Sequence, residues 1–135
     1  MKRILLVDDD LPLQKLLGMM LQDAGYQVGV ASNGNEALCQ LQEQGPWDVV
    51  LCDILMPERD GIETIAAIRR AFAQQVVVAM TGGGNYHVLQ VQELLAVAKL
   101  FGASQVLRKP FSREQLLTAV QAALALSASQ QTAEG

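Results

Sequence analysis

Five residues that could carry out chemistry stand where short apolar runs of the sequence end. Asp8 and Asp9 follow the first such run, and Asp53 follows the third. Thr81 and Lys109 follow the fourth and fifth runs in the same way. Runs of this kind are typical of strands that are buried on both faces of a parallel sheet. Because the carboxyl ends of parallel strands meet at one edge, we expect all five side chains to lie together there.

This set of side chains favours a divalent metal ion and the transfer of a phosphoryl group. Carboxylates about 4 Å apart repel one another by about 4 kcal/mol for each pair at an effective dielectric constant of about 20. A bound hard cation relieves that repulsion, and oxygen ligands without His or Cys suit Mg²⁺. Asp53 would act as the nucleophile, while Lys109 and the Thr81 hydroxyl stabilise charge on the phosphoryl oxygens. Each residue alone has a structural explanation, such as a cap, a turn or a solvated lysine, so the prediction depends on their joint position.

The elements that must position these residues alternate between strands and helices along the chain. The hydrophobic patterns predict strands at residues 4–7, 27–31, 49–52, 76–80 and 105–108. They predict helices at about residues 12–24, 33–44, 62–72, 86–101 and 112–126. Gly25 is expected just after the first helix, and Ser112 with Gln115 forms a capping box at the start of the last. The alternation predicts an α/β fold, a doubly wound five-stranded parallel sheet with five helices on its two faces.

Length and composition limit the classes of function. The chain has 135 residues, of which 50% are hydrophobic and 18% are charged, with a formal net charge of −4. These values fit one domain with one core, expected over residues 1–126, and the absence of a basic face argues against direct binding of nucleic acid. The first apolar run is too short for a signal peptide or a membrane span, so we expect a cytoplasmic protein that contacts no membrane. Cys39 and Cys52 are interpreted as reduced thiols.

Four segments, in this order, resemble the receiver domain of the two-component response-regulator family. They are ILLVDDD at residues 4–10, VVLCDILMPERDG at 49–61, VVVAMTGG at 76–83 and VLRKPF at 106–111. The resemblance covers about residues 2–126 and implies a flavodoxin-like sheet with strand order 2-1-3-4-5.

The resemblance also implies roles for the residues at the strand ends. Asp53 would accept a phosphoryl group from a sensor histidine kinase or a phosphotransfer protein. Asp8 and Asp9 would hold Mg²⁺ together with Asp53 and the backbone carbonyl of Leu55. Thr81 and Lys109 would contact the attached phosphoryl group, and the Lys109–Pro110 bond would be cis. Such a protein is not an enzyme in the usual sense, although it promotes its own Mg²⁺-dependent aspartyl phosphorylation and dephosphorylation.

Two features depart from the family pattern. Receivers commonly carry an aromatic residue three positions before the lysine, and here that position is Val106, so the usual aromatic signal of switching is missing. The segment between Thr81 and Lys109 is longer than is typical by about two helical turns. Its predicted helix, residues 86–101, is apolar nearly all round, which fits either a long core helix or a face for a partner or for self-association. His87, in the same segment, is interpreted as a surface residue.

Several functions fit this sequence. The first is a signalling switch that is phosphorylated at Asp53 and whose altered surface binds a downstream protein target. The second is the N-terminal receiver of a larger DNA-binding transcriptional regulator, because residues 127–135 have the composition of a disordered tail or of the start of a linker. The third is a phosphorelay intermediate. A metal-dependent phosphatase is set aside, because Leu55 stands where such enzymes need a second aspartate.

Overall fold

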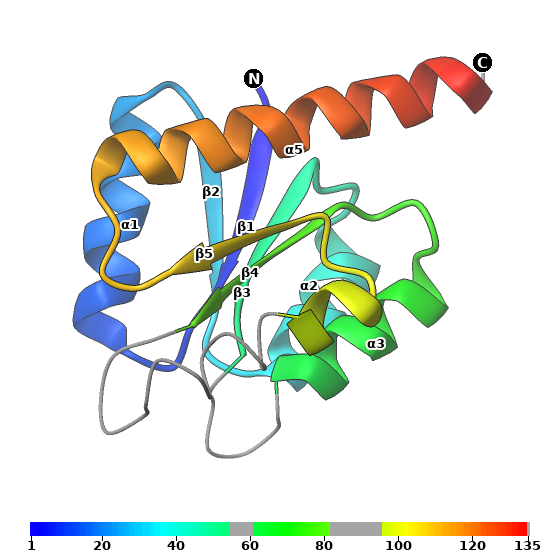
Figure 1. Cartoon of the computed structure of the whole chain (residues 1–135), viewed down its shortest axis with the longest axis horizontal. Coiled ribbons are helices and arrows are strands. Elements are labelled where there is room, and N and C mark those ends of the chain that lie inside the picture. Colours follow the sequence, from blue (N-terminus) through cyan, green and yellow to red (C-terminus); the bar gives the residue numbers. More distant parts are fainter. Residues whose placement is uncertain (55–60, 82–95, 135) are drawn as a thin grey trace.

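The computed structural model of the protein describes residues 1–54, 61–81 and 96–134. Figure 1 shows a central sheet with helices on both of its faces. The elements are β1 (Arg3–Val7), α1 (Leu11–Asp23), β2 (Gln27–Ala31), α2 (Gly34–Gln44), β3 (Val49–Asp53), α3 (Gly61–Ala71), β4 (Val77–Thr81), β5 (Gln105–Arg108) and α5 (Arg113–Glu134). Residues 96–100 are also helical.

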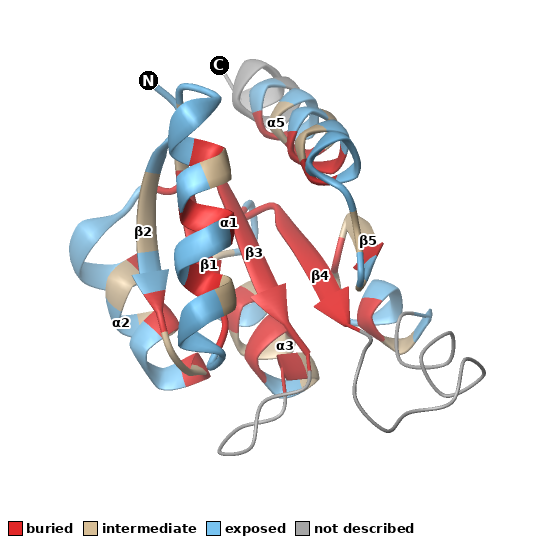
Figure 2. Ribbon diagram, turned by 90° about the vertical axis from the view of Figure 1, so that its left-hand side faces the viewer, coloured by how far each residue is buried: buried red, intermediate tan, exposed pale blue. Residues whose placement is uncertain are grey.

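The sheet has five strands in the order β2-β1-β3-β4-β5, and every pair of neighbours is parallel. This order confirms the predicted doubly wound α/β fold. The five strands lie within one residue of the predicted ranges, because continuous apolar runs bounded by polar residues mark fully buried strands clearly. In Figure 2 the strands β1, β3 and β4 are buried along nearly their whole length, while the edge strand β2 is partly exposed.

Successive side chains of each strand enter two separate cores. Leu5 and Val7 of β1 pack with apolar side chains of α2 and α3. Ile4 and Leu6 pack instead with side chains of α1 and α5. Because neighbouring residues of a strand point to opposite faces, an uninterrupted apolar run is what a sheet covered on both faces requires. The two cores hold the central strands rigidly, and the ends of these strands carry the candidate site.

Local signals in the sequence set the helix ends. Asp10 is the N-cap of α1, and its side chain accepts a hydrogen bond from the backbone N of Leu13 at 3.1 Å. Gly25 follows the C-cap of α1 with φ +97°, a backbone conformation that favours glycine, as predicted. The predicted capping box of α5 is confirmed, because Gln115 N donates to Ser112 Oγ at 3.1 Å and Ser112 N donates to Gln115 Oε1 at 2.8 Å.

The last two predicted helices differ from the observed ones in extent. The last helix was predicted to end near residue 126, but α5 continues through residues 127–134 and ends at Glu134. The reason is that these residues contain neither Gly nor Pro, and Ala and Gln extend a helix readily once it has formed. A domain boundary at residue 126, and a disordered tail or the start of a linker at residues 127–135, stay predictions. Of the predicted helix at 86–101, the structure describes residues 96–100 as helical, whereas residues 86–95, including His87, lie outside the described residues.

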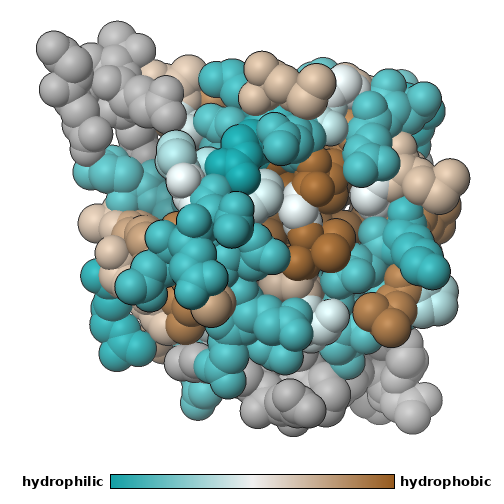
Figure 3. All heavy atoms as spheres, turned by 180° about the vertical axis from the view of Figure 1, so that it is seen from behind, coloured by the Kyte–Doolittle hydropathy of each residue, from teal (hydrophilic) through white to brown (hydrophobic). Residues whose placement is uncertain are grey.

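The surface is mainly hydrophilic where Figure 3 shows it. Seen from behind the view of Figure 1, polar residues dominate and hydrophobic residues form small groups between them. Among the described residues, no helix is both long enough and apolar enough to cross a membrane.

Candidate functional site

The register of the sheet brings the predicted residues to one edge. β1 pairs with β3 so that Val7 lies beside Cys52. Asp8 directly follows Val7, and Asp53 directly follows Cys52. β4 ends at Thr81, one residue beyond the level of Asp53. The expected meeting of the strand ends is therefore confirmed.

Lys109 joins two of the carboxylates. Its Nζ lies 3.2 Å from Asp8 Oδ2 and 3.2 Å from Asp53 Oδ2. The Lys109–Pro110 bond is cis, as the resemblance implied, and the backbone N of Lys109 donates to the carbonyl oxygen of Thr81 at 2.6 Å. One ammonium group thus holds carboxylates from two different strands.

The pKa of Lys109 follows from this position. Burial is the largest single influence, and it lowers the pKa because it disfavours the charged form. The charges of Asp53 and Asp8, and the hydrogen bonds to both, act in the opposite direction and outweigh it. The net result is a pKa raised above the usual value for lysine, so Lys109 stays positively charged at neutral pH.

Three carboxylates lie close enough to share a cation. Asp8, Asp9 and Asp53 each offer an oxygen, and these oxygens lie within 4.8 Å of one another. Asp8 and Asp53 are buried while Asp9 is exposed, which leaves one side open to solvent. An all-oxygen set that is partly open fits Mg²⁺, which keeps several of its waters. Leu55, whose carbonyl was expected to join this set, lies outside the described residues.

The third residue of the aspartate run has a different task. The Asp10 side chain caps α1, and its backbone N donates to Asp8 Oδ1 at 3.0 Å. The cap and the hydrogen bond together fix the turn from which Asp8 and Asp9 reach the site.

Thr81 carries an unpaired polar atom. Its side chain is completely buried, and among the described residues its Oγ1 is the only buried side-chain nitrogen or oxygen without a hydrogen-bond partner. A buried hydroxyl without a partner costs about 1–3 kcal/mol. Such an atom in a native site therefore needs an explanation.

Gln14 is a site-supporting residue that the sequence did not single out. Its buried Nε2 donates to the backbone oxygens of Asp8 at 3.1 Å and Ala31 at 3.2 Å. These bonds join α1 to the ends of β1 and β2, next to the clustered carboxylates of Asp8 and Asp9. The available signal was a polar residue on the otherwise apolar face of a helix, which is costly to bury unless it makes hydrogen bonds.

The first residue of α3 packs closely against the end of β3, the strand that carries Asp53. The backbone N of Gly61 donates to the Ile54 oxygen at 3.2 Å. A Cβ at Gly61 would meet the backbone of Ile54 and the carbonyl oxygen of Asp53, so only glycine fits without a shift of the backbone. Val106, at the position of the missing aromatic, is partly buried and packs against the core beneath α2 and α3.

The comparisons with known proteins agree with this geometry. The transcriptional regulatory protein CpxR homolog of Haemophilus influenzae is 37% identical over 129 residues, which are 96% of this chain and 53% of that protein. This chain therefore spans about half the length of that curated relative. A CheY-like response regulator receiver domain protein from Methanospirillum hungatei has a TM-score of 0.84 at 25% identity, covering 96% of this chain and 98% of that one. The response regulator TrrA of Thermotoga maritima has a TM-score of 0.77 at 32% identity, covering 92% and 100%.

The family assignment depends on the whole fold and not on the site alone. The pattern of the response regulator receiver domain matches residues 4–121. Apart from the first residue of β1, that range contains all five strands, together with the three acidic residues at their ends, Thr81 and Lys109. The chain therefore belongs to the family of response regulator receiver domains of two-component systems.

Proposed function

We propose that this receiver domain is a phosphorylation-dependent signalling switch in which Asp53 accepts a phosphoryl group. The donor would be a sensor histidine kinase or a phosphotransfer protein, which would place the protein in the cytoplasm. The observation that carries the proposal is the Lys109 ammonium, held 3.2 Å from both Asp53 and Asp8. A buried strand keeps Asp53 in a fixed orientation, as a nucleophile requires.

The acidic residues would hold Mg²⁺. Asp8, Asp9 and Asp53 supply the carboxylate oxygens, and the Leu55 carbonyl is a further ligand implied by the family resemblance. When bound, Mg²⁺ supplies positive charge that offsets the negative charge of the phosphoryl oxygens. The solved structure of TrrA is a complex with Mg²⁺ and a beryllium fluoride, which supports a similar site in this chain.

The protein's own groups orient and neutralise the incoming phosphoryl group. The Asp53 carboxylate attacks phosphorus as the donor's bond to phosphorus breaks, and Lys109 donates hydrogen bonds to the phosphoryl oxygens. The Thr81 hydroxyl, buried without a partner, gains an acceptor when such an oxygen arrives. By these contacts the domain would promote its own aspartyl phosphorylation and, with water as the attacking group, its dephosphorylation.

The response would be a change of binding surface that a downstream protein target recognises. New bonds to Thr81 and Lys109 bias the ends of β4 and β5 toward a second arrangement. Val106 stands where receivers commonly carry the aromatic residue that signals switching. The surface that changes in this chain can therefore differ from the one that changes in those receivers.

A second candidate function is the receiver of a larger DNA-binding transcriptional regulator. The observation that favours it is the relative from H. influenzae, a transcriptional regulatory protein of which this chain covers 53%. In that case α5, which continues to Glu134, would lead toward a further domain. The complete reading frame of the gene tests this candidate directly.

The proposed phosphorylation is tested by the substitution Asp53→Asn. The wild-type protein with Mg²⁺ and acetyl phosphate should gain one phosphoryl group by intact-protein mass spectrometry, and Asp53→Asn should gain none. The matched control is Asp48→Asn, at the other end of β3, where the side chain accepts a hydrogen bond from Arg3 N at 2.8 Å. Equal labelling of Asp53→Asn and the control would end the assignment of Asp53.

A further inference from the structure

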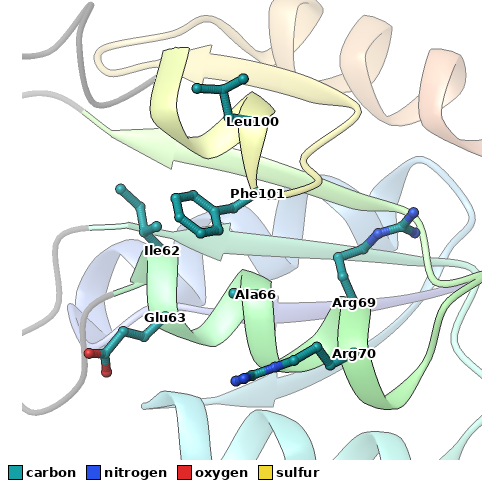
Figure 4. A pocket seen from close by; sticks show the side chains of 7 residues that line it. All are labelled: Ile62, Glu63, Ala66, Arg69, Arg70, Leu100 and Phe101. Atoms are coloured by element: carbon teal, nitrogen blue, oxygen red, sulfur yellow. The ribbon is translucent and has the colours of Figure 1, made fainter.

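A groove separate from the acidic site lies beside α3. It has a volume of about 580 Å³ and runs between α3 and residues 100–101. Its apolar part is exposed, since Leu100 is 84% and Phe101 is 49% accessible to solvent. Ile62 and Ala66 of α3 form the opposite wall, and Figure 4 shows the Phe101 ring pointing toward this wall. Exposed apolar side chains that gather around a groove mark an interaction surface better than single ones do.

Opposite charges stand along α3 beside this apolar part. Glu63 lies in the first turn of α3 and Arg70 in the last, and both side chains are exposed. Seven residues are two helical turns, so the two side chains share a face of α3 and are separated by about 10 Å along its axis. In Figure 4 both lie on the same side of the helix. Arg70 forms no ion pair within the described ranges 1–54, 61–81 and 96–134.

We propose that a second copy of this chain covers the groove, with the two α3 helices packed antiparallel about a two-fold axis. Glu63 of each copy would then face Arg70 of the other, so that the interface contains the same ion pair twice. Ala66, midway between them, is small enough to let the helices approach closely. The exposed Leu100 and Phe101 of each copy would pack against the apolar wall of the other.

The charge pattern is the reason to expect a second copy and not a different protein. A two-fold interface must be complementary to itself, because each residue meets the image of another residue of the same surface. A negative and a positive group at opposite ends of an apolar strip meet this condition when the strip is paired antiparallel. The ion pairs lie at the rim, so they determine the register of the two copies more than the strength of association.

Sedimentation velocity of the full chain over a concentration series tests the proposal. The wild type should associate reversibly to a dimer. Glu63→Arg and Arg70→Glu should each weaken dimerisation by about tenfold or more, because each change acts twice in the interface. The double variant E63R/R70E should return to within about threefold of the wild type, since both pairs are restored with their signs exchanged. Lys15→Glu, on the exposed face of α1, is the matched control and should have no effect.

The apolar part of the interface is tested separately. Leu100→Ser should abolish the dimer without loss of stability, because Leu100 has little contact with the core. Circular dichroism and thermal unfolding verify that each variant is folded. A wild type that stays monomeric at every concentration overturns the proposal. That result is expected if the groove binds only a different protein. A double variant as weak as the single ones also overturns it, as does a dimer lost on Glu114→Arg of α5 but kept by the groove variants.

Discussion

The two sides of the strand-end site differ in how completely their polar groups are paired. On the acidic side, Asp8 accepts hydrogen bonds from Lys109 and from Asp10 N, and Asp53 accepts one from Lys109. On the other side, the Thr81 hydroxyl is equally buried and has no partner. Asp53 and Thr81 nevertheless stand at the ends of neighbouring strands, β3 and β4.

In the proposed function, this difference would separate accepting a phosphoryl group from responding to it. Groups that are already held in place need no reorganisation when the phosphoryl group arrives, which favours the reaction. The unpaired hydroxyl raises the free energy of the unmodified state, so a ligand oxygen that pairs with it stabilises the modified state relative to the unmodified one. In the proposed function, the acidic side would therefore serve the reaction and Thr81 the switch.

The largest expected effect comes from disrupting the acidic side at Asp8. Asp8→Asn removes a carboxylate that would offer an oxygen to Mg²⁺ and that accepts a hydrogen bond from Lys109. We expect the rate of Mg²⁺-dependent labelling by acetyl phosphate to fall by about 100-fold or more, since both cationic groups lose an anionic partner. The rate is followed by mass spectrometry at a fixed Mg²⁺ concentration.

The control for this prediction is Asp10, two residues after Asp8 in the same aspartate run. Asp10→Asn keeps a good N-cap for α1 and removes one negative charge from the same run. Its labelling rate should stay within about twofold of the wild type, because a single exposed charge is largely screened. A similar loss in both variants would mean that only the total negative charge matters, and the distinction between Asp8 and Asp10 would be wrong.

The next effect concerns the stability of the unmodified domain. Lys109→Met keeps most of the side-chain length but leaves the two buried carboxylates without their cation. We expect a loss of about 2 kcal/mol in the free energy of unfolding without Mg²⁺, less than for a fully buried pair because Lys109 keeps some solvent contact. Urea denaturation measures it, and added Mg²⁺ should recover more stability in this variant than in the wild type. Equal stabilisation of both proteins by Mg²⁺ would contradict the prediction, and Lys15→Met is the exposed control.

The sequence predicted the sheet almost completely because buried parallel strands leave the clearest pattern. Each run of apolar residues ends at a polar residue, and in a parallel sheet all these ends meet at one edge. Helix ends were predicted where a specific residue sets them, as at Gly25 and Ser112. The end of α5 was missed because Ser and Thr among residues 127–134 are typical of a tail, whereas the Ala and Gln residues between them extend a helix that the preceding turns have already formed.

The sequence predicted where the site lies, but not which of its polar groups form hydrogen bonds. That Asp8, Asp53 and Lys109 meet follows from strand ends alone. That Lys109 bridges the two carboxylates while Thr81 stays unpaired depends on ångström-scale distances, which no sequence pattern encodes. For Gln14, the sequence shows a polar residue on an apolar helix face, but its partners are backbone atoms of Asp8 and Ala31, which no sequence pattern identifies.

A smaller effect is expected when the support of the acidic side is removed. Gln14→Met takes away both hydrogen bonds to the ends of β1 and β2 while keeping a similar length. We expect the dissociation constant for Mg²⁺ to rise by about tenfold, as for other residues that orient metal ligands without binding the metal. Isothermal titration calorimetry measures it, with Gln22→Met on the exposed face of α1 as the control. Unchanged Mg²⁺ affinity in a folded Gln14→Met protein would show that these bonds serve stability alone.

The smallest expected effect has opposite signs in the two states of the switch. Thr81→Val replaces the unpaired hydroxyl by a methyl group of similar size, so the unmodified protein should keep its stability or gain about 1 kcal/mol. With Mg²⁺ and beryllofluoride, a mimic of the phosphoryl group, the same change should reduce the rise in melting temperature, because the mimic loses a hydrogen-bond donor. Thr81→Ser keeps the hydroxyl and should retain most of that rise. If Thr81→Val instead destabilises the unmodified protein by more than about 1 kcal/mol, the hydroxyl already has a partner in solution, and the contrast between the two sides of the site disappears.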